Sequence, residues 1–158
     1  MHMQVRGSSG TAASVSSAWA AVAAFASAVD AELDRWLADR YRIGLTDCRA
    51  LAALSRSADK ELRVSELAQQ VGLTQSSATR LVSRLEAKKL VRRDVCTDDG
   101  RGVYAVLTAQ GEALLGDLRT PYEERVRDLL SAAGARFPEL DLPRLAGALG
   151  TVGALLAD

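Results

Sequence analysis

The spacing of apolar residues divides the 158-residue chain into a long helix, a central block of short elements and a helical C-terminal part. Residues 1–14 are polar, rich in Gly and Ser and without periodicity, so we expect a disordered N-terminal segment. Apolar residues then recur at three- and four-residue steps over Val15–Tyr41, which predicts one amphipathic helix. Helical spacing returns after Thr108, and we expect helices over 109–158 that the three prolines bend or interrupt.

Two short helices are predicted in the first half of the central block. Thr46 is expected to cap a helix over Cys48–Leu54, because its hydroxyl can accept a hydrogen bond from a free amide of the first turn. A loop over Ser55–Lys60 and a brief extended piece over Leu62–Val64 follow. Ser65 is then expected to cap the second helix, over Glu66–Val71.

A third short helix follows after a tight turn. Gly72 is suited to the positive φ of that turn, and Thr74 is expected to cap a helix that runs to about Ala87. One face of this helix is apolar and consists of Ala78, Leu81, Val82 and Leu85. The opposite face consists of Gln75, Ser76, Thr79, Arg80 and Ser83.

Two strand-like runs, Leu90–Val95 and Val103–Leu107, come next and enclose a charged, Gly-containing tip. Helix, turn, helix and hairpin in this order are the layout of a winged helix-turn-helix. We therefore expect a mainly α fold with a small β-hairpin wing, in one domain over 15–158 whose winged helix occupies 46–108.

Charge is balanced over the whole chain but not along it. The formal net charge is zero, from 20 basic and 20 acidic residues. Residues 46–108 carry eleven bases and eight acids, whereas residues from 109 onward carry five bases and eight acids. The positive charge is therefore concentrated in the predicted winged helix, where it favours contact with DNA phosphates.

The polar face of the third short helix has the residue types that read base edges, since Arg pairs with guanine, Gln with adenine, and hydroxyls with either. We predict DNA contacts from Gln75, Ser76, Thr79, Arg80, Ser83 and Arg84. Ser65 and Thr74 are candidate phosphate contacts, or simply helix caps. In the tip, Asp99 can brace Arg101 for insertion into the minor groove, or the two form only a weak surface ion pair.

Other chemistries find little support in the composition. Two cysteines and one histidine provide neither a disulfide framework nor a zinc site, and no paired carboxylates or nucleophile–base set indicates an enzyme. We predict no metal and no cofactor. A signal peptide ending at Ala28 is an alternative that the continuous helical spacing past it disfavours, and no apolar run is long enough to span a bilayer. A cytoplasmic protein is expected.

Three motifs carry a resemblance to a known family: Ser65–Ala68, Thr74–Val82, and Asp99–Gly102 closing on Val106–Thr108. They resemble the MarR family of bacterial transcriptional regulators, most strongly over Thr46–Gly111. The resemblance implies a homodimer held by helices in 15–45 and 109–158, bound to double-stranded DNA at a pseudo-palindrome through successive major grooves. It also implies base contacts from Ser76, Ser77 and Arg80, and minor-groove insertion of Arg101.

The sequence departs from the family pattern at one position, and the resemblance leaves several functional alternatives open. Relatives usually have Gly where this chain has Lys89, so a left-handed backbone there would be strained. Many relatives bind small aromatic effectors, and Trp36, Tyr41 and Cys48 are candidate pocket residues, or simply core residues. The alternatives to an effector-relieved regulator are a thiol-based redox sensor and a winged helix that binds protein rather than specific DNA.

Overall fold

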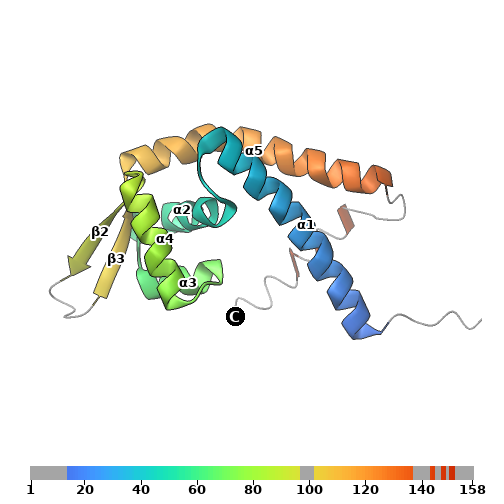
Figure 1. Cartoon of the computed structure of the whole chain (residues 1–158), viewed down its shortest axis with the longest axis horizontal. Helices are drawn as coiled ribbons and strands as arrows, with labels where there is room; N and C mark the ends of the chain where they lie inside the picture. Colours follow the sequence, from blue (N-terminus) through green and yellow to red (C-terminus); the bar gives the residue numbers. More distant parts are fainter. Residues whose placement is uncertain (1–13, 97–101, 137–142, 145–146, 149, 152–158) are drawn as a thin grey trace, which may run out of the picture.

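The computed structural model describes residues 14–96, 102–136, 143–144, 147–148 and 150–151 (Figure 1). The predicted N-terminal segment, the wing tip with Asp99 and Arg101, and most of the last predicted helix lie outside these residues. The elements are α1 (Val15–Tyr41), α2 (Leu45–Arg56), the 3-10 helix η1 (Ala58–Lys60), β1 (Glu61–Arg63), α3 (Val64–Val71), α4 (Gln75–Ala87), β2 (Val91–Cys96), β3 (Gly102–Leu107) and α5 (Ala109–Arg136).

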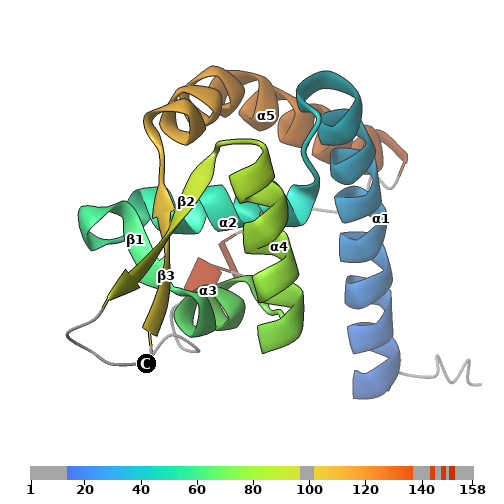
Figure 2. The same cartoon turned by 60° about the vertical axis from the view of Figure 1, so that its left-hand side comes forward.

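The sheet has three antiparallel strands in the order β1-β3-β2, one more than the predicted hairpin (Figure 2). β2 and β3 pair from Val91 opposite Leu107 to Cys96 opposite Gly102, which confirms the two predicted wing strands. On the other edge of β3, β1 places Arg63 opposite Tyr104. The wing is therefore anchored by the segment that directly precedes α3.

The start of α2 differs from the sequence prediction. The helix begins at Leu45, and the Asp47 carboxylate accepts a hydrogen bond from the backbone N–H of Gly44 at 3.0 Å. Thr46 lies inside the first turn, so its prediction as the N-cap is wrong. The helix also continues to Arg56, one residue beyond the start of the predicted loop.

The start of α3 is also displaced. Arg63 is the N-cap and its backbone N–H donates to Glu66 Oε2 at 3.0 Å, so the helix begins one residue before Ser65. The prediction of Ser65 as a cap is therefore wrong. The polar side chain that stabilises this helix start is thus the carboxylate three residues after the N-cap, which accepts from the N-cap amide, rather than a hydroxyl at the cap.

The turn between α3 and α4 is as predicted. Gly72 has φ +68°, and Leu73 N–H donates to the Ala68 carbonyl at 2.8 Å, which closes α3 in a left-handed cap. Thr74 is the N-cap of α4, and its Oγ1 accepts a hydrogen bond from Ser77 N–H at 3.3 Å. This turn fixes the angle between the two short helices.

The core lies between α2, α3, α4, the sheet and the C-terminal half of α1. It includes Leu37, Leu51, Leu54 and Leu67, and it takes in the predicted apolar face of α4: Ala78, Leu81, Val82 and Leu85. α1 and α5 extend to one side of this compact group (Figure 1). α5 is continuous through Pro121, so the helix does not restart there.

Candidate nucleic-acid interface

The outer face of α4 presents the polar side chains that the sequence predicted. Gln75, Ser76, Thr79 and Arg80 are all exposed, while the opposite face of the helix is buried. Thr79 Oγ1 donates to the Gln75 carbonyl at 3.0 Å, which leaves the oxygen free to accept from a base or phosphate. The face therefore offers amide, hydroxyl and guanidinium groups side by side.

Ser77 is arranged differently from its neighbours. It is half-buried, its backbone N–H caps onto Thr74, and Thr74 Oγ1 lies 3.0 Å from Ser77 Oγ. Arg80 Nη2 donates to the same Ser77 oxygen at 3.4 Å. The small hydroxyl network thus orients Arg80 along the start of α4, and base contact by Ser77 stays a prediction.

Ser83 connects α4 to the wing. Its hydroxyl donates to the Thr79 carbonyl at 3.1 Å and contacts Arg93 Nη2 of β2. Arg93 N–H also donates to Glu86 Oε2 at 3.1 Å. These contacts set the position of the wing relative to α4, so Ser83 has a structural role that its place on the polar face did not reveal.

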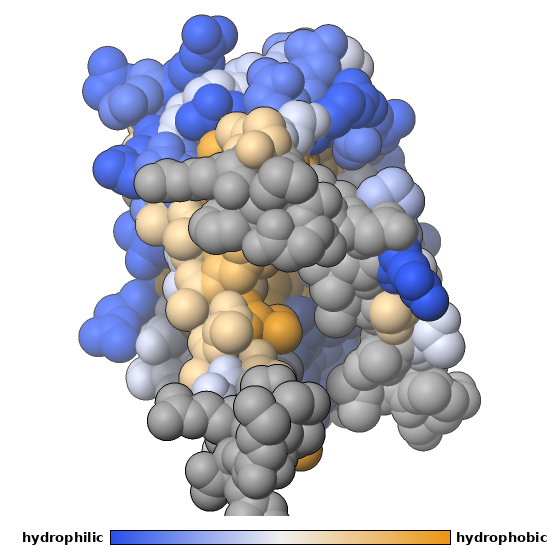
Figure 3. All heavy atoms as spheres, turned by 90° about the vertical axis from the view of Figure 1, so that its right-hand side faces the viewer, coloured by the Kyte–Doolittle hydropathy of each residue, from blue (hydrophilic) through white to orange (hydrophobic). Residues whose placement is uncertain are grey.

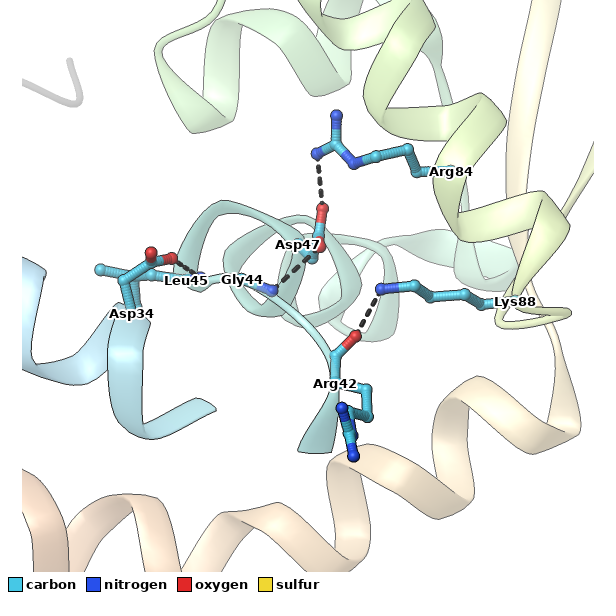
Figure 4. Close-up of polar contacts among 7 residues, drawn as sticks. All are labelled: Asp34, Arg42, Gly44, Leu45, Asp47, Arg84 and Lys88. Atoms are coloured by element: carbon cyan, nitrogen blue, oxygen red, sulfur yellow. Dashed lines mark hydrogen bonds and ion pairs between the residues drawn. The ribbon is translucent and has the colours of Figure 1, made fainter. Parts of the chain in front are cut away.

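Arg84 points toward α2 rather than away from the molecule (Figure 4). Its Nη2 donates to Asp47 Oδ1 at 2.9 Å, and the Asp47 side chain is only 6% exposed. Residue spacing carries no signal for this pairing, because the two residues lie 37 positions apart. Direct contact of Arg84 with DNA is untested and remains a prediction.

The basic cluster of α4 and β2 is largely braced by the protein itself. Arg84, Arg92 and Arg93 contact carboxylates, and the Lys88 ammonium contacts the Arg42 carbonyl. Arg80 has a serine hydroxyl as its polar contact, so it keeps its full charge for an external partner. Among the described bases of this cluster, Arg80 is the one placed on the polar face of α4.

The root of the wing is held by a side chain that the sequence analysis did not select. The Arg63 guanidinium lies 5.4 Å from the centre of the Tyr104 ring, in a cation–π arrangement. A β-carbon on Gly102 would come within 3.5 Å of Arg63 Nη1. β1 therefore supplies a positive charge beside the point where the wing tip begins. Arg63 could not be selected from residue spacing, because its position depends on the pairing of β1 with β3.

The backbone after α4 adopts the left-handed conformation that Lys89 was expected to strain. Lys89 has φ +63°, its N–H donates to the Glu86 carbonyl at 2.9 Å, and Leu90 N–H donates to the Leu85 carbonyl at 3.0 Å. This is a Schellman closure, which glycine favours. Thr108 Oγ1 donates to the Lys89 carbonyl at 2.7 Å and fixes the turn against α5.

The three candidate pocket residues differ in their positions relative to two cavities beside α5. Tyr41 lines a cavity of about 430 Å³ beside α5, and Cys48 lines another of about 400 Å³ between α2 and α5. Trp36 lines neither of these, and its ring packs edge-on against Tyr41 with centroids 5.4 Å apart. A ligand role for these three residues stays a prediction.

Cys48 is buried, and burial raises the pKa of its thiol, an effect that neighbouring Arg49 opposes only in part. A raised pKa reduces the thiolate fraction, which is the form that oxidants attack. Cys48 therefore lacks the environment of a reactive cysteine.

Within the part of the chain that the structure describes, no group of three or more His, Cys, Asp or Glu side chains is placed to hold a metal ion. The described helices also include none with both the length and the apolar character required to cross a bilayer.

A capped helix pair, an exposed polar face on its second helix and an adjoining three-stranded wing define a winged helix-turn-helix protein. Residues 43–102 match the family model described as MarR family. This part of the chain, which contains most of the winged helix, is therefore similar to the MarR family.

Solved structures resemble the chain over most of its length. Sco3205, a MarR family transcriptional regulator from Streptomyces coelicolor in complex with DNA, is 25% identical, with TM-score 0.75 and coverage of 96% of this chain and 91% of its own. AbsC from the same organism is 27% identical, with TM-score 0.72 and coverage of 91% and 96%. The S. aureus MepR–DNA complex, at 19% identity, TM-score 0.67 and coverage of 91% and 97%, shares the fold. No curated protein matches the chain.

Proposed function

We propose that this protein is a sequence-specific DNA-binding transcriptional regulator that acts in the cytoplasm as a homodimer. The observation that carries the proposal is the exposed face of α4, where Arg80 keeps an uncompensated charge beside Gln75, Ser76 and Thr79. These groups match the donor and acceptor pattern of the major groove. The family and the DNA complex of Sco3205 support the same assignment.

The homodimer is proposed from the apolar surface of α1. Val15, Trp19 and Val22 are 88%, 68% and 41% exposed, and apolar residues form a band on the side of the molecule that carries this helix (Figure 3). Large exposed apolar patches indicate a partner surface. A second copy of the chain is the proposed partner, since a two-fold dimer places two α4 helices on a pseudo-palindrome.

Selection from a random duplex library with the purified protein tests this function. A regulator enriches a palindromic motif whose half-sites are about one helical turn apart, 10–10.5 bp. The competing function is a winged helix that binds an acidic protein partner through its basic residues. Such a module would enrich no motif, and its weak DNA affinity would be equal for selected and random duplexes.

We also propose that a small aromatic molecule relieves DNA binding. The cavity between α2 and α5 supports this, since about 400 Å³ accommodates a compact ligand and its lining combines Tyr122 and Leu118 with Arg49 and Arg119. An aromatic carboxylate would find both apolar walls and positive charge there. Titration of benzoate derivatives against the protein–operator complex tests this proposal. The ligand should release the wild-type protein from the operator, whereas Arg119→Ala should stay bound.

A further inference from the structure

Asp34 and Asp47 fix the connection between α1 and α2 (Figure 4). Asp34 Oδ1 accepts a hydrogen bond from the backbone N–H of Leu45 at 2.7 Å. Asp47 Oδ2 accepts from the N–H of Gly44 at 3.0 Å. The C-terminal end of α1 and the first turn of α2 are therefore joined by carboxylates that satisfy amides left free at a helix start.

Two basic side chains of α4 and its following turn reach the same place (Figure 4). Arg84 donates to the second oxygen of Asp47 at 2.9 Å, and the Lys88 ammonium donates to the carbonyl of Arg42. Arg42 ends α1 in a left-handed cap. The helix proposed to read DNA is thus linked by polar contacts to the end of the helix proposed to form the dimer.

Burial makes the Asp47–Arg84 pair the strongest of these links. Among the described residues, Asp47 is the one charged residue in the buried class, at 4% exposure. Without Arg84, the buried Asp47 carboxylate would keep the Gly44 amide but lose its opposite charge, which is unfavourable, so the structure favours the arrangement that keeps Arg84 on Asp47. The Arg84 side chain is 55% exposed, so the contact lies at the surface end of the buried site.

The pair adds direction to packing that is otherwise non-directional. α4 contacts the core through Ala78, Leu81, Val82 and Leu85, and the hydrophobic effect that buries these side chains has no directional preference of its own. A charge-assisted hydrogen bond fixes both a distance and an angle. Arg84 therefore restricts the rotation of α4 about its own axis and its tilt against α2.

We propose that the Asp47–Arg84 ion pair sets the half-site spacing that the dimer recognises, with Arg84 acting as a positioning residue rather than as a DNA contact. The inference rests on the proposed function, because it concerns two α4 helices on one duplex. Adding one base pair between half-sites increases their separation by about 3.4 Å and rotates one relative to the other about the duplex axis by roughly 35°. A firmly oriented α4 rejects that change, whereas a loosely oriented one tolerates it.

The test measures affinity for operators whose half-sites are separated by the selected spacing, one base pair less and one base pair more. We expect the wild-type protein to prefer the selected spacing by roughly tenfold, a difference of ~1.4 kcal/mol. Asp47→Asn and Arg84→Met should each lower this preference to about threefold or less, mainly by improving relative binding to the altered spacings. Helical circular dichroism and dimer mass verify that each variant is folded.

Two features of the same experiment separate positioning from direct contact. If Arg84 contacts a phosphate, Arg84→Met lowers the magnitude of the slope of log affinity against log salt concentration by about one per protomer. In that case Asp47→Asn, which frees Arg84, maintains or improves affinity at every spacing. Either result overturns the proposal. We expect an unchanged salt dependence and the same loss of spacing preference in both variants. The double variant should show no further loss.

Arg80→Met is the matched control, since it makes the same substitution one turn earlier on α4. Its affinity should fall at all three spacings while the preference among them stays. If the wild-type protein enriches no motif at all, the proposed function fails. If it enriches a palindrome but Asp47→Asn and Arg84→Met keep the wild-type spacing preference, only the present inference fails.

Discussion

At the scale of single residues, the turn after α4 holds a lysine in a backbone conformation that glycine favours. Lys89 occupies a left-handed position at the end of α4, with φ +63°. This left-handed conformation could be predicted, because Lys89 stands where relatives usually have glycine. The caps of α2 and α3 could not, since Asp47 and Glu66 act from inside the first turn and displace the boundaries assigned to Thr46 and Ser65.

Lys89→Gly should stabilise the protein. Glycine relieves the left-handed strain, and we expect a gain of up to about 1 kcal/mol in the free energy of unfolding, reduced by glycine's greater freedom in the unfolded chain. Urea denaturation followed by circular dichroism measures the difference. Lys88→Gly is the matched control, because Lys88 has φ −84° and its replacement should not stabilise. A lower midpoint for Lys89→Gly contradicts the strain at this turn.

Gly111→Ala should destabilise the protein. A β-carbon at Gly111 would collide with the Leu90 carbonyl oxygen and lie 2.6 Å from Leu107 Cδ1. Overpacking of this kind costs about 1–3 kcal/mol. Gly116→Ala, on the same helix with open space around it, should be neutral or stabilising. Equal denaturation midpoints for the two variants would argue against the close approach of α5 to the turn after α4.

The raised pKa of Cys48 predicts slow alkylation. Because burial raises the thiol pKa above its ordinary value of 9.0, the thiolate fraction at pH 8 is small and continues to grow above pH 9. In a Cys96→Ser background, the rate of reaction with iodoacetamide should therefore keep rising between pH 8 and pH 10. A rate that is already maximal at pH 8 would indicate an activated thiol and revive the redox-sensor alternative.

At the scale of elements, hydrophobic periodicity predicted the long helices and α4 well, because amphipathic faces of this length have few alternatives. The bounds of α1 and the buried face of α4 agree with the spacing. β1 was predicted only as a brief extended piece over Leu62–Val64, and its place in a sheet was not, since a three-residue strand has no periodicity of its own. Its pairing with β3 is a tertiary contact, as is the position of Ser83 against Arg93.

The contact of β2 with α4 predicts a selective role for Glu86. Glu86 accepts a hydrogen bond from Arg93 N–H, and so fixes the edge of the wing beside α4. Glu86→Ala should lower stability by about 0.5–1.5 kcal/mol, as expected for one hydrogen bond. Amide hydrogen exchange should locate the loss of protection in β2 rather than in α2. Uniform loss across both elements would contradict a local tie between the wing and α4.

At the scale of the whole molecule, the family resemblance implied a homodimer, and the exposed apolar side of α1 is the surface proposed for it. Trp19→Glu places a charge on the proposed interface, where burial without a partner is unfavourable. We expect sedimentation equilibrium to show a shift from dimer toward monomer. Glu32→Gln, at a half-buried position near the other end of α1, should keep the wild-type mass. A Trp19→Glu variant that remains fully dimeric would exclude this part of α1 from the interface.

The account depends most on one assignment, the reading of base edges by the exposed face of α4. The most direct test is the specificity profile of Arg80→Ala on the selected operator and its single-base variants, with Arg127→Ala on α5 as the control. We predict that Arg80→Ala loses about 1–3 kcal/mol of discrimination at one base position in each half-site, while Arg127→Ala keeps the wild-type profile. An unchanged profile in Arg80→Ala would contradict the assignment.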